Sequence, residues 1–439
     1  MNELIDSQQA TSGDRPVWID LPYGTTTISC VVPARNLAGV FSPRVTGNLP
    51  VMEQEFRRAL ASPIGVPPLR QAARGARRVV IVADDLTRAT PVDRMIPLVL
   101  DELNAAEISD DQVTVLIALG THRPMTDGEI QARFGESVTR RVTVINNPWQ
   151  DARQMVKLGE TSNGTPVSIS RYALQADYLI GLGSIVPHHI PGFSAGAKII
   201  QPGITGAETT GATHYLSTRT SGSYLGQLEN PVRAEMEDIA RRAGLKAVFN
   251  VVLNPGGEVV RAVFGDFRDA FRQGVAAARQ VYGIEIARKA DIVIANAHPC
   301  EIEFWQSHKA LYPAEIAVKP GGRIIITTPC PEGVSVMHPD ILDFTALSSQ
   351  QIDACLQDGT IRDMVSGALA LAWAKVREKA RVSLVSEGIS AEETRALGFD
   401  YFSSLQDALD AAMVEMGSNA MVTVLTHAPD MLPTIGNRK

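Results

Sequence analysis

Short apolar runs rich in β-branched residues alternate with stretches of helical periodicity over the first two thirds of the chain. Such runs are typical of strands buried on both faces, and their alternation with helices predicts a parallel sheet covered by helices. The predicted strands are residues 78–83, 113–119, 142–145 and 178–182, and the predicted helices are residues 95–105 and 127–134.

A second series of the same kind begins near residue 290, after a predicted helix over residues 266–282 that Gly283 ends. We therefore predict an α/β fold made of two α/β domains with mainly parallel sheets, residues 1–282 and 283–439. The last apolar run, residues 421–425, is a candidate to return to the first domain. The predicted strands of the second series are residues 292–295, 323–327 and 382–385, and its long helix is residues 361–379.

The bulk composition narrows the class of protein. Hydrophobic residues make up 45% and charged residues 20% of the 439 residues, which is the balance of a globular protein with two or three domains. The net charge of -7 disfavours binding to nucleic acid. The polar N-terminus does not resemble a signal peptide, no apolar run reaches the roughly 20 residues that span a bilayer, and the four cysteines are scattered. We therefore expect a cytoplasmic protein with reduced thiols.

The sequence DDLTR, residues 84–88, directly follows the first predicted strand. Ligands of open α/β sheets collect beyond the carboxyl ends of strands, so Asp85 and Arg88 can face a crevice. Arg88 could bind a carboxylate through two parallel hydrogen bonds, and Asp85 could orient a base or the arginine. A capped turn with a surface ion pair explains the same residues.

The sequence GTHRPMT, residues 120–126, follows the next predicted strand and places His122 at the same rim. A histidine there suits proton transfer near neutral pH, although a structural histidine is the commoner case. Thr126 and Glu129 have the spacing of a capping box, which predicts that a helix begins there.

A glycine-rich stretch, residues 181–211, shows little helical periodicity, which in a compact domain is typical of a functional loop. We expect Gly192 and Gly196 to let a ligand approach the backbone, so that the loop cradles a phosphate. The spacing matches neither a Walker A loop nor a complete G-x-G-x-x-G turn, and a connector with a solvated lysine is the alternative. The loop gathers His188, His189, Ser194 and Lys198.

Two further clusters complete the polar candidates. His214, sixteen residues after Lys198, could bind a metal through a neutral ring nitrogen, although a lone histidine is more often a core residue. Gln306 and Lys309, at i and i+3 of a predicted helix, could hold polar oxygens of a ligand between the domains, with Trp305 as a wall. An exposed helix start explains this cluster equally well.

Taken in order, these clusters resemble the lactate racemase family of nickel-pincer-nucleotide racemases and epimerases. The matching motifs are DDLTR (84–88), GTHRPMT (120–126), HHIPGFSAGAK (188–198), His214 and QSHK (306–309). No single motif is specific, but five in this order point to the family, though not to one substrate. The resemblance implies two α/β domains with the active site in the cleft between them. It also implies an enzyme that inverts C2 of a 2-hydroxy acid by reversible hydride transfer, through a 2-keto acid.

The resemblance assigns a role to each candidate residue. The implied cofactor is a nickel-pincer nucleotide, joined to Lys198 through a thioamide. The implied catalytic residues are His122 and His188 as paired acid/bases, with Asp85 and Arg88. The implied cofactor-binding residues are Lys198, Gly192, Ser194 and Gly196, and the implied nickel ligand is His214. The implied substrate-binding residues are Arg88, Gln306, Lys309 and Trp305.

The resemblance further implies a small 2-hydroxy acid and the cofactor-synthesis proteins as partners, with no nucleic acid and no membrane. Ala195 departs from the family pattern by one methyl group. Ile190 and Trp305 also depart from it beside proposed catalytic residues, which predicts a pocket not shaped for lactate itself. Two other functions stay open. A nicotinamide-dependent 2-hydroxy acid dehydrogenase is one, against which the incomplete glycine fingerprint argues. A non-catalytic protein that binds a nucleotide or hydroxy acid is the other.

Overall fold

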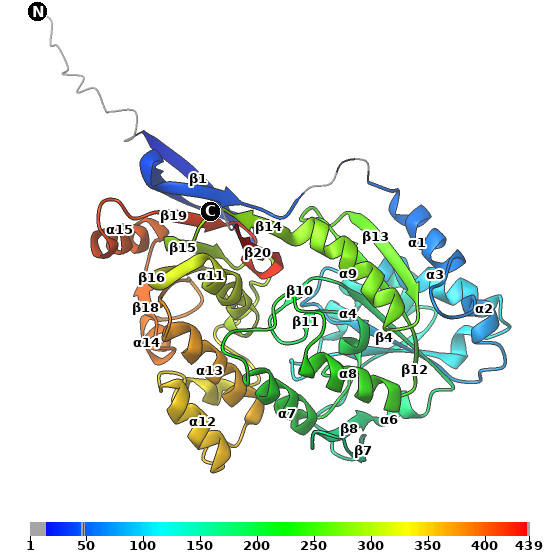
Figure 1. Cartoon of the computed structure of the whole chain (residues 1–439). Coiled ribbons are helices and arrows are strands. Elements are labelled where there is room, and N and C mark those ends of the chain that lie inside the picture. The colour runs from blue at the N-terminus through cyan, green and yellow to red at the C-terminus, as the bar shows by residue number, and fades with distance from the viewer. Residues whose placement is uncertain (1–14, 45–46, 48, 437–439) are drawn as a thin grey trace, which may run out of the picture.

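The computed structural model describes residues 15–44, 47 and 49–436. Within these residues, two six-stranded sheets packed against helices form two bodies that lie side by side (Figure 1). The described chain also forms four two-stranded pairs: β1 (Pro16–Tyr23) with β2 (Thr26–Pro33), β7 (Met155–Glu160) with β8 (Pro166–Ser170), β10 (Pro187–His188) with β11 (Gly192–Phe193), and β14 (Gly283–Ile286) with β20 (Leu432–Ile435).

The first sheet is parallel except for β13, which runs antiparallel to β12 at one edge. Its central strand β4 has the sequence VVIVAD, and the first five of its residues are buried, as the continuous apolar run predicts. In spatial order the strands are β13 (Val259–Gly265), β12 (Leu245–Leu253), β9 (Tyr178–Ser184), β4 (Val79–Asp84), β5 (Val113–Ala118) and β6 (Thr143–Asn146).

The helices of the first body include those that the sequence predicts. The capping box at Thr126 is confirmed, because its side chain accepts the Glu129 N–H and α4 begins at Asp127. The helix predicted over residues 266–282 begins three residues later, since the Asp266 carboxylate accepts the N–H groups of Arg268 and Asp269. The helices are α1 (Met52–Ala61), α2 (Leu69–Ala72), α3 (Val92–Asn104), α4 (Asp127–Phe134), α5 (Glu136–Thr139), α6 (Arg171–Leu174), α7 (Ala207–Ser217), α8 (Pro231–Arg242) and α9 (Asp269–Tyr282).

The second sheet is parallel throughout. In spatial order its strands are β18 (Asp400–Phe402), β17 (Arg381–Val385), β16 (Val318–Thr327), β15 (Ala290–Asn296), β19 (Val422–Leu425) and β3 (Leu37–Phe41). The helices of this body are α10 (Phe304–Ser307), α11 (Leu311–Ala317), α12 (Ser349–Gln357), α13 (Met364–Arg377), α14 (Ala391–Ala396) and α15 (Leu405–Met416). Six 3-10 turns lie in the described chain: η1 (Ala34–Asn36), η2 (Asp110–Gln112), η3 (Gly196–Ile199), η4 (His308–Ala310), η5 (Pro339–Asp343) and η6 (Ala428–Asp430). No helix of the described chain is both long and apolar enough to cross a membrane.

The strand pairing corrects the expected division of the chain in two places. The run at residues 421–425 does not return to the first domain, because β19 pairs with β15 and β3 in the second sheet. Near the N-terminus, β3 belongs to this second sheet, and the β1–β2 hairpin packs on the same body. An edge strand as short as β3 has only alternating partial burial, so its own pattern does not reveal which sheet it joins.

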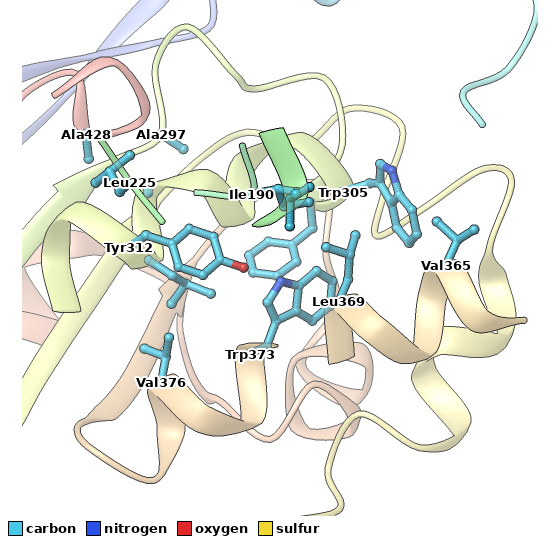
Figure 2. Close-up of a cluster of buried hydrophobic side chains, with 14 of the residues drawn as sticks. Ile190, Leu225, Ala297, Trp305, Tyr312, Val365, Leu369, Trp373, Val376 and Ala428 are labelled. Carbon is cyan, nitrogen blue, oxygen red and sulfur yellow. The ribbon is translucent and has the colours of Figure 1, made fainter. Parts of the chain in front are cut away.

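The two bodies share one hydrophobic core. A single cluster of buried side chains runs from β4 and β5 of the first body to α13 of the second. Figure 2 shows part of this junction, where Ile190, from the turn between β10 and β11, lies beside Trp305 and Leu369 of the second body. Burial of apolar surface therefore fixes how the two sheets face each other.

The strand order of the first sheet places a ligand-binding crevice beside the carboxyl end of β4. In the first sheet the chain passes from β4 to β5 and β6 on one side and to β9, β12 and β13 on the other. Such a reversal opens a crevice beyond the carboxyl ends of the strands, where ligands of α/β sheets bind. The glycine-rich stretch that follows β9 fills this region with β10, β11 and η3, and it is buried rather than an open loop.

Candidate active site

The carboxyl ends of β4 and β5 carry an aspartate and a histidine that bond to each other. Asp85 directly follows β4, and His122 lies in the turn after β5. Because these strands are parallel neighbours, two residues that are 37 apart in sequence meet at one rim, with Asp85 Oδ2 at 2.6 Å from His122 Nδ1. Asp85 is thus placed to orient His122.

The Asp85 carboxylate selects the tautomer of His122 that carries its proton on Nδ1. Asp85 is 3% exposed, and this burial by itself raises the pKa of its carboxyl group. The attraction of His122 and Arg88 outweighs the burial and holds the pKa of Asp85 below its ordinary value. The carboxylate therefore accepts the Nδ1–H of His122, which selects the tautomer whose lone pair lies on Nε2 whenever the ring is neutral. That nitrogen lies 2.9 Å from Gln306 Nε2, which reaches it from the second body.

Two cations and an amide form the opposite wall. Arg88 Nη1 lies 2.8 Å from Thr87 Oγ1 and 3.4 Å from Gln306 Oε1, and Lys309 Nζ donates to the same Gln306 oxygen. Burial, with Arg88 nearby, lowers the pKa of Lys309 to about 8, so the ammonium form prevails at neutral pH. Among the described residues neither cation has a carboxylate partner within salt-bridge distance. The pair therefore offers an anion site.

Lys198, in η3, lines the same cavity as Arg88 and Lys309. Its amine forms no hydrogen bond with any residue of the described chain, although part of its surface faces the cavity. Burial, together with the nearby charges of Arg88 and Lys309, holds the pKa of Lys198 well below its ordinary value. An uncharged amine is the nucleophilic form of lysine, so this site favours a covalent bond at the nitrogen.

His188, at the end of β10, is 7% exposed and differs from His122 in its hydrogen bonding. Its Nδ1 accepts the backbone N–H of Ile190 at 3.2 Å, so the neutral ring carries its proton on Nε2. Burial holds the pKa of His188 well below its ordinary value. At rest, His188 is therefore a hydrogen-bond donor at Nε2, whereas His122 is an acceptor.

The glycines of this loop correct the expectation of a phosphate cradle. A Cβ on Gly192 would lie 1.9 Å from the carbonyl oxygen of Gln227, and a Cβ on Gly196 would lie 2.8 Å from the ring of Phe271. Both glycines have positive φ, and the Gly196 N–H donates to the Asn250 side chain at 3.2 Å. Because protein already fills the space beside them, they permit close packing of the loop rather than approach of a ligand.

Ser194 is likewise occupied by the loop itself. Its hydroxyl donates to the carbonyl of Ser184 at 2.5 Å and accepts the N–H of Val186 at 2.9 Å. Arg233, buried in α8, holds the same loop by donating to the carbonyls of Phe193 and Ala195. These bonds fix the backbone that carries His188 and Lys198.

His214, in α7, presents one free ring nitrogen. Its Nδ1 lies 2.8 Å from the carbonyl oxygen of Thr210, one helical turn earlier, so Nδ1 carries the proton and Nε2 keeps its lone pair. Burial lowers the pKa of His214 to about 3, so the ring is neutral. A neutral imidazole oriented by a backbone carbonyl is the usual state of a metal-ligating histidine.

Trp305 lines the same cavity. Its ring stacks on that of His338 with a centroid distance of 4.2 Å. His338 bonds in turn to Asp363, and its Nε2 lies 3.1 Å from the hydroxyl of Thr121, the neighbour of His122. Trp305 is therefore tied to both bodies.

One cavity brings the polar candidates together, with an empty volume of about 810 Å³ including its mouth. Of the predicted site residues, Gly192 and Gly196 do not line it. Those that do are Asp85, Arg88, His122, His188, Ser194, Lys198, His214, Trp305, Gln306 and Lys309.

The cavity is also lined by two further histidines, His189 and His308, to which the sequence motifs assign no role. His189 is 6% exposed, and neither ring nitrogen bonds to any described residue. Its ring lies between those of His188 and Tyr312, and His308 contacts its edge. The signal was present, because His189 and His308 belong to the motifs HHIPGFSAGAK and QSHK, but spacing alone does not show that they face one cavity.

Comparisons with known proteins agree with this arrangement. Residues 23–226 match the family model described as the lactate racemase N-terminal domain, and residues 286–431 match that of the lactate racemase C-terminal domain. The lactate racemase of Thermoanaerobacterium thermosaccharolyticum is 32% identical over 321 residues, which are 72% of this chain and 75% of that protein. The lactate racemase of Lactiplantibacillus plantarum is 28% identical over 95% of this chain and 99% of that protein.

Solved structures give the same result for the fold. The lactate racemase apoprotein from Thermoanaerobacterium thermosaccharolyticum has a TM-score of 0.85 at 27% identity, and the match covers 95% of this chain and 100% of that one. A protein from Thermotoga maritima has a TM-score of 0.71 at 18% identity over 90% of this chain and 100% of that one, which shows a shared fold alone. The two family models together span most of the sequence, and with the 32% identical relative they show that this chain belongs to the lactate racemase family and is an isomerase.

Proposed function

We propose that the chain inverts C2 of a 2-hydroxy acid by reversible hydride transfer to a nickel-pincer nucleotide joined to Lys198. The observation that carries this proposal is the content of one cavity. It holds a lysine whose amine is favoured uncharged, an imidazole oriented by a buried carboxylate, and two cations without carboxylate partners among the described residues. Both relatives named above are lactate racemases, so lactate is the first substrate to test.

The residues present fit this cofactor. The amine of Lys198, which bonds to no described residue, would suit a thioamide link, and the Nε2 of His214, which also bonds to no described residue, would suit nickel. His189, buried with both ring nitrogens unbonded, offers further polar contacts to a bound group. When bound, the nucleotide supplies a carbon of its pyridinium ring that accepts and returns a hydride.

Arg88 and Lys309 bind the substrate carboxylate in this mechanism. Two cations on one wall neutralise the carboxylate, and the planar guanidinium of Arg88 can hold both of its oxygens. Gln306 bonds to both cations and to His122, so the position of the carboxylate is coupled to the position of the base. The substrate hydroxyl then replaces the amide of Gln306 as the partner of His122 Nε2.

His122 removes the hydroxyl proton while the C2 hydrogen leaves as hydride. Loss of a hydride avoids a carbanion beside a carboxylate, and Asp85 stabilises the imidazolium that forms. The hydroxyl carbon becomes the carbonyl carbon of a bound 2-keto acid. General-base help of this kind is worth about 10²–10⁴-fold in rate.

His188 serves the opposite enantiomer. Its Nε2–H donates to the keto oxygen once the intermediate has turned its other face, and the returning hydride then leaves the opposite configuration at C2. The ring can pass on this proton only as it gains another at Nδ1 from solvent, which requires the 3.2 Å bond from Ile190 to lengthen. His122 releases to solvent the proton that it took from the substrate, so the protons balance over one turnover. The two imidazoles thus act on opposite faces from different resting states.

The test uses protein purified from cells that also make the cofactor-synthesis proteins, which we propose as partners. We expect a peptide containing Lys198 to carry added mass and optically pure lactate to lose optical purity without net oxidation. Net oxidation that depends on added nicotinamide nucleotide would instead support a dehydrogenase. Full activity of unmodified, nickel-free protein would contradict the proposal.

A further inference from the structure

A second chamber adjoins the active-site cavity, and the mechanism does not use it. Arg88, His188 and Lys309 line both spaces, so the chamber begins where the substrate carboxylate and hydroxyl are proposed to lie. Its lining continues away from these three residues to Asn254 of the first body and Asp430 of the second. The polar lining that it does not share with the cavity includes His298, Cys300, His427 and Asp430 of the second body.

The topology of the second sheet explains this position. From β15 the chain passes to β16, β17 and β18 on one side, while β19 and β3 lie on the other. His298 and Cys300 directly follow β15, and His427 and Asp430 follow β19. The chamber therefore lies beyond the carboxyl ends of the two strands at which the order reverses, the usual place for a ligand in an α/β sheet. Each body thus contributes one such crevice, and the two meet at Arg88 and Lys309.

The chamber combines the donors of Arg88 and Lys309 with acceptors that the second body adds. The Asp430 carboxylate forms no hydrogen bond with any described residue. Burial, partly offset by Lys309 and Arg88, raises the pKa of Asp430 to about 6, so it remains ionised at neutral pH. His298 Nδ1 lies 2.7 Å from the Glu301 carboxylate, so Nε2 is the ring nitrogen that can bond to an occupant. An occupant that satisfies these groups must bring donors.

The surrounding charges narrow the occupant further. Both signs of charge line the chamber, so a second carboxylate would meet Asp430 as well as the two cations, and an ammonium group would meet Arg88 and Lys309 as well as Asp430. Neither charged group is therefore matched throughout. An apolar substituent would leave Asp430 and His298 without partners in a buried space, which is costly. Hydroxyl groups meet all these conditions, because each can donate to Asp430 or His298 and accept from Lys309.

We propose that this chamber is the subsite for the part of the substrate beyond C2, and that it takes a polyhydroxylated chain. The inference rests on the proposed function and names its substrate class: a 2-hydroxy acid with further hydroxyl groups, rather than one that ends in a methyl group. The departures at Ile190 and Trp305, which line the other side of the shared cavity, agree with a pocket not shaped for lactate.

The first experiment needs no variant. Holoprotein with the Lys198 adduct is given lactate, gluconate, malate or 3-phenyllactate, and inversion at C2 is followed by chiral chromatography. We expect kcat/KM for gluconate to exceed that for each of the others by at least about tenfold, on the scale of one hydrogen bond to a charged group. A preference for lactate, malate or 3-phenyllactate overturns the proposal.

The second experiment removes the charge of Asp430 with little change in shape. Asp430→Asn is expected to lower the ratio of kcat/KM for gluconate to that for lactate by about ten- to a hundredfold. Asp343→Asn, at an exposed carboxylate of the same body, is the matched control and should leave the ratio unchanged. A merely structural role for Asp430 would lower both rates together and leave the ratio where it was, which overturns the proposal.

Binding measured by calorimetry separates this proposal from the proposed function. Gluconate that binds the holoprotein and loses about tenfold in affinity with Asp430→Asn supports the subsite, even if no acid is inverted. Inversion of lactate with no measurable binding of gluconate supports the proposed function and overturns the subsite.

Discussion

The rims of the two sheets face each other across one cavity, but they hold their ionisable groups in different states. At the first rim His122 is bonded to a carboxylate, whereas Lys198 and His214 are held in uncharged form by burial. At the second rim Lys309 and Asp430 keep their charges and have no ion-pair partner among the described residues. Uncharged nucleophiles and bases suit bond making, whereas unpaired charges suit binding of a polar substrate. We infer that the first body performs the chemistry, and that the second body, together with Arg88 of the first, selects the substrate.

The largest effect is expected from removing Lys198, the residue to which we propose the cofactor is joined. Lys198→Ala should abolish inversion, because it removes the only amine that the mechanism uses for covalent attachment. Intact-mass analysis should show no added mass. Lys309→Met is the matched control at the second rim, and it should keep the adduct on Lys198 while weakening substrate binding. An adduct that persists in Lys198→Ala would place the attachment elsewhere.

The Asp85–His122 pair should give the next largest effect. His122→Ala is expected to lower kcat by about 10²–10⁴-fold, the usual contribution of a general base. Asp85→Asn should approach the same loss, because a neutral amide does not stabilise the imidazolium and its NH2 can donate to Nδ1, which would move the ring proton of His122 to Nε2. Single-turnover kinetics on both enantiomers measures each step. If Asp85→Asn retains most of the rate, the carboxylate does not set the state of His122.

Much of the first rim could be predicted from the sequence. DDLTR and GTHRPMT each follow a continuous apolar strand, so the rule that parallel strands end at one edge already places Asp85 and His122 together. The helix start at Thr126 is likewise visible because capping is local. Local patterns succeed here because the residues that determine the structure lie within a few positions of it.

The remaining features depend on contacts between distant residues. Gly192 and Gly196 signal close approach, but only the fold shows that Gln227 and Phe271 occupy the space. The place of β3 in the second sheet depends on a strand nearly 400 residues later. Nothing near Asp430 marks it as part of a site, since the chamber exists only where β15 and β19 end side by side.

The pH dependence of kcat/KM tests whether Lys309, at the second rim, binds the substrate as a cation. Burial, with Arg88 nearby, lowers the pKa of Lys309 from 10.5 to about 8, so its cationic form is lost as the pH rises through 8. If Lys309 binds the carboxylate as a cation, kcat/KM should fall above about pH 8, by up to about tenfold per pH unit. Lys309→Arg should remove this limb, since arginine stays charged. The same falling limb in the arginine variant would assign the titration to another group.

The smallest effect is expected from removing Arg123, which forms one of the ion pairs between the two bodies. Arg123 pairs with Glu332 of the second body and with Glu129 of its own, but its side chain is 24% exposed, so solvent weakens the attraction. Arg123→Ala should lower the free energy of unfolding by about 1 kcal/mol or less, with the difference shrinking in 1 M salt, as followed by chemical denaturation. Arg140→Ala, which breaks an exposed pair within the first body, is the control and should change stability by less. The apolar core that both bodies share, rather than this ion pair, would then hold the two rims at their working distance. A loss of several kcal/mol that salt removes would instead make the arrangement of the rims depend on charge.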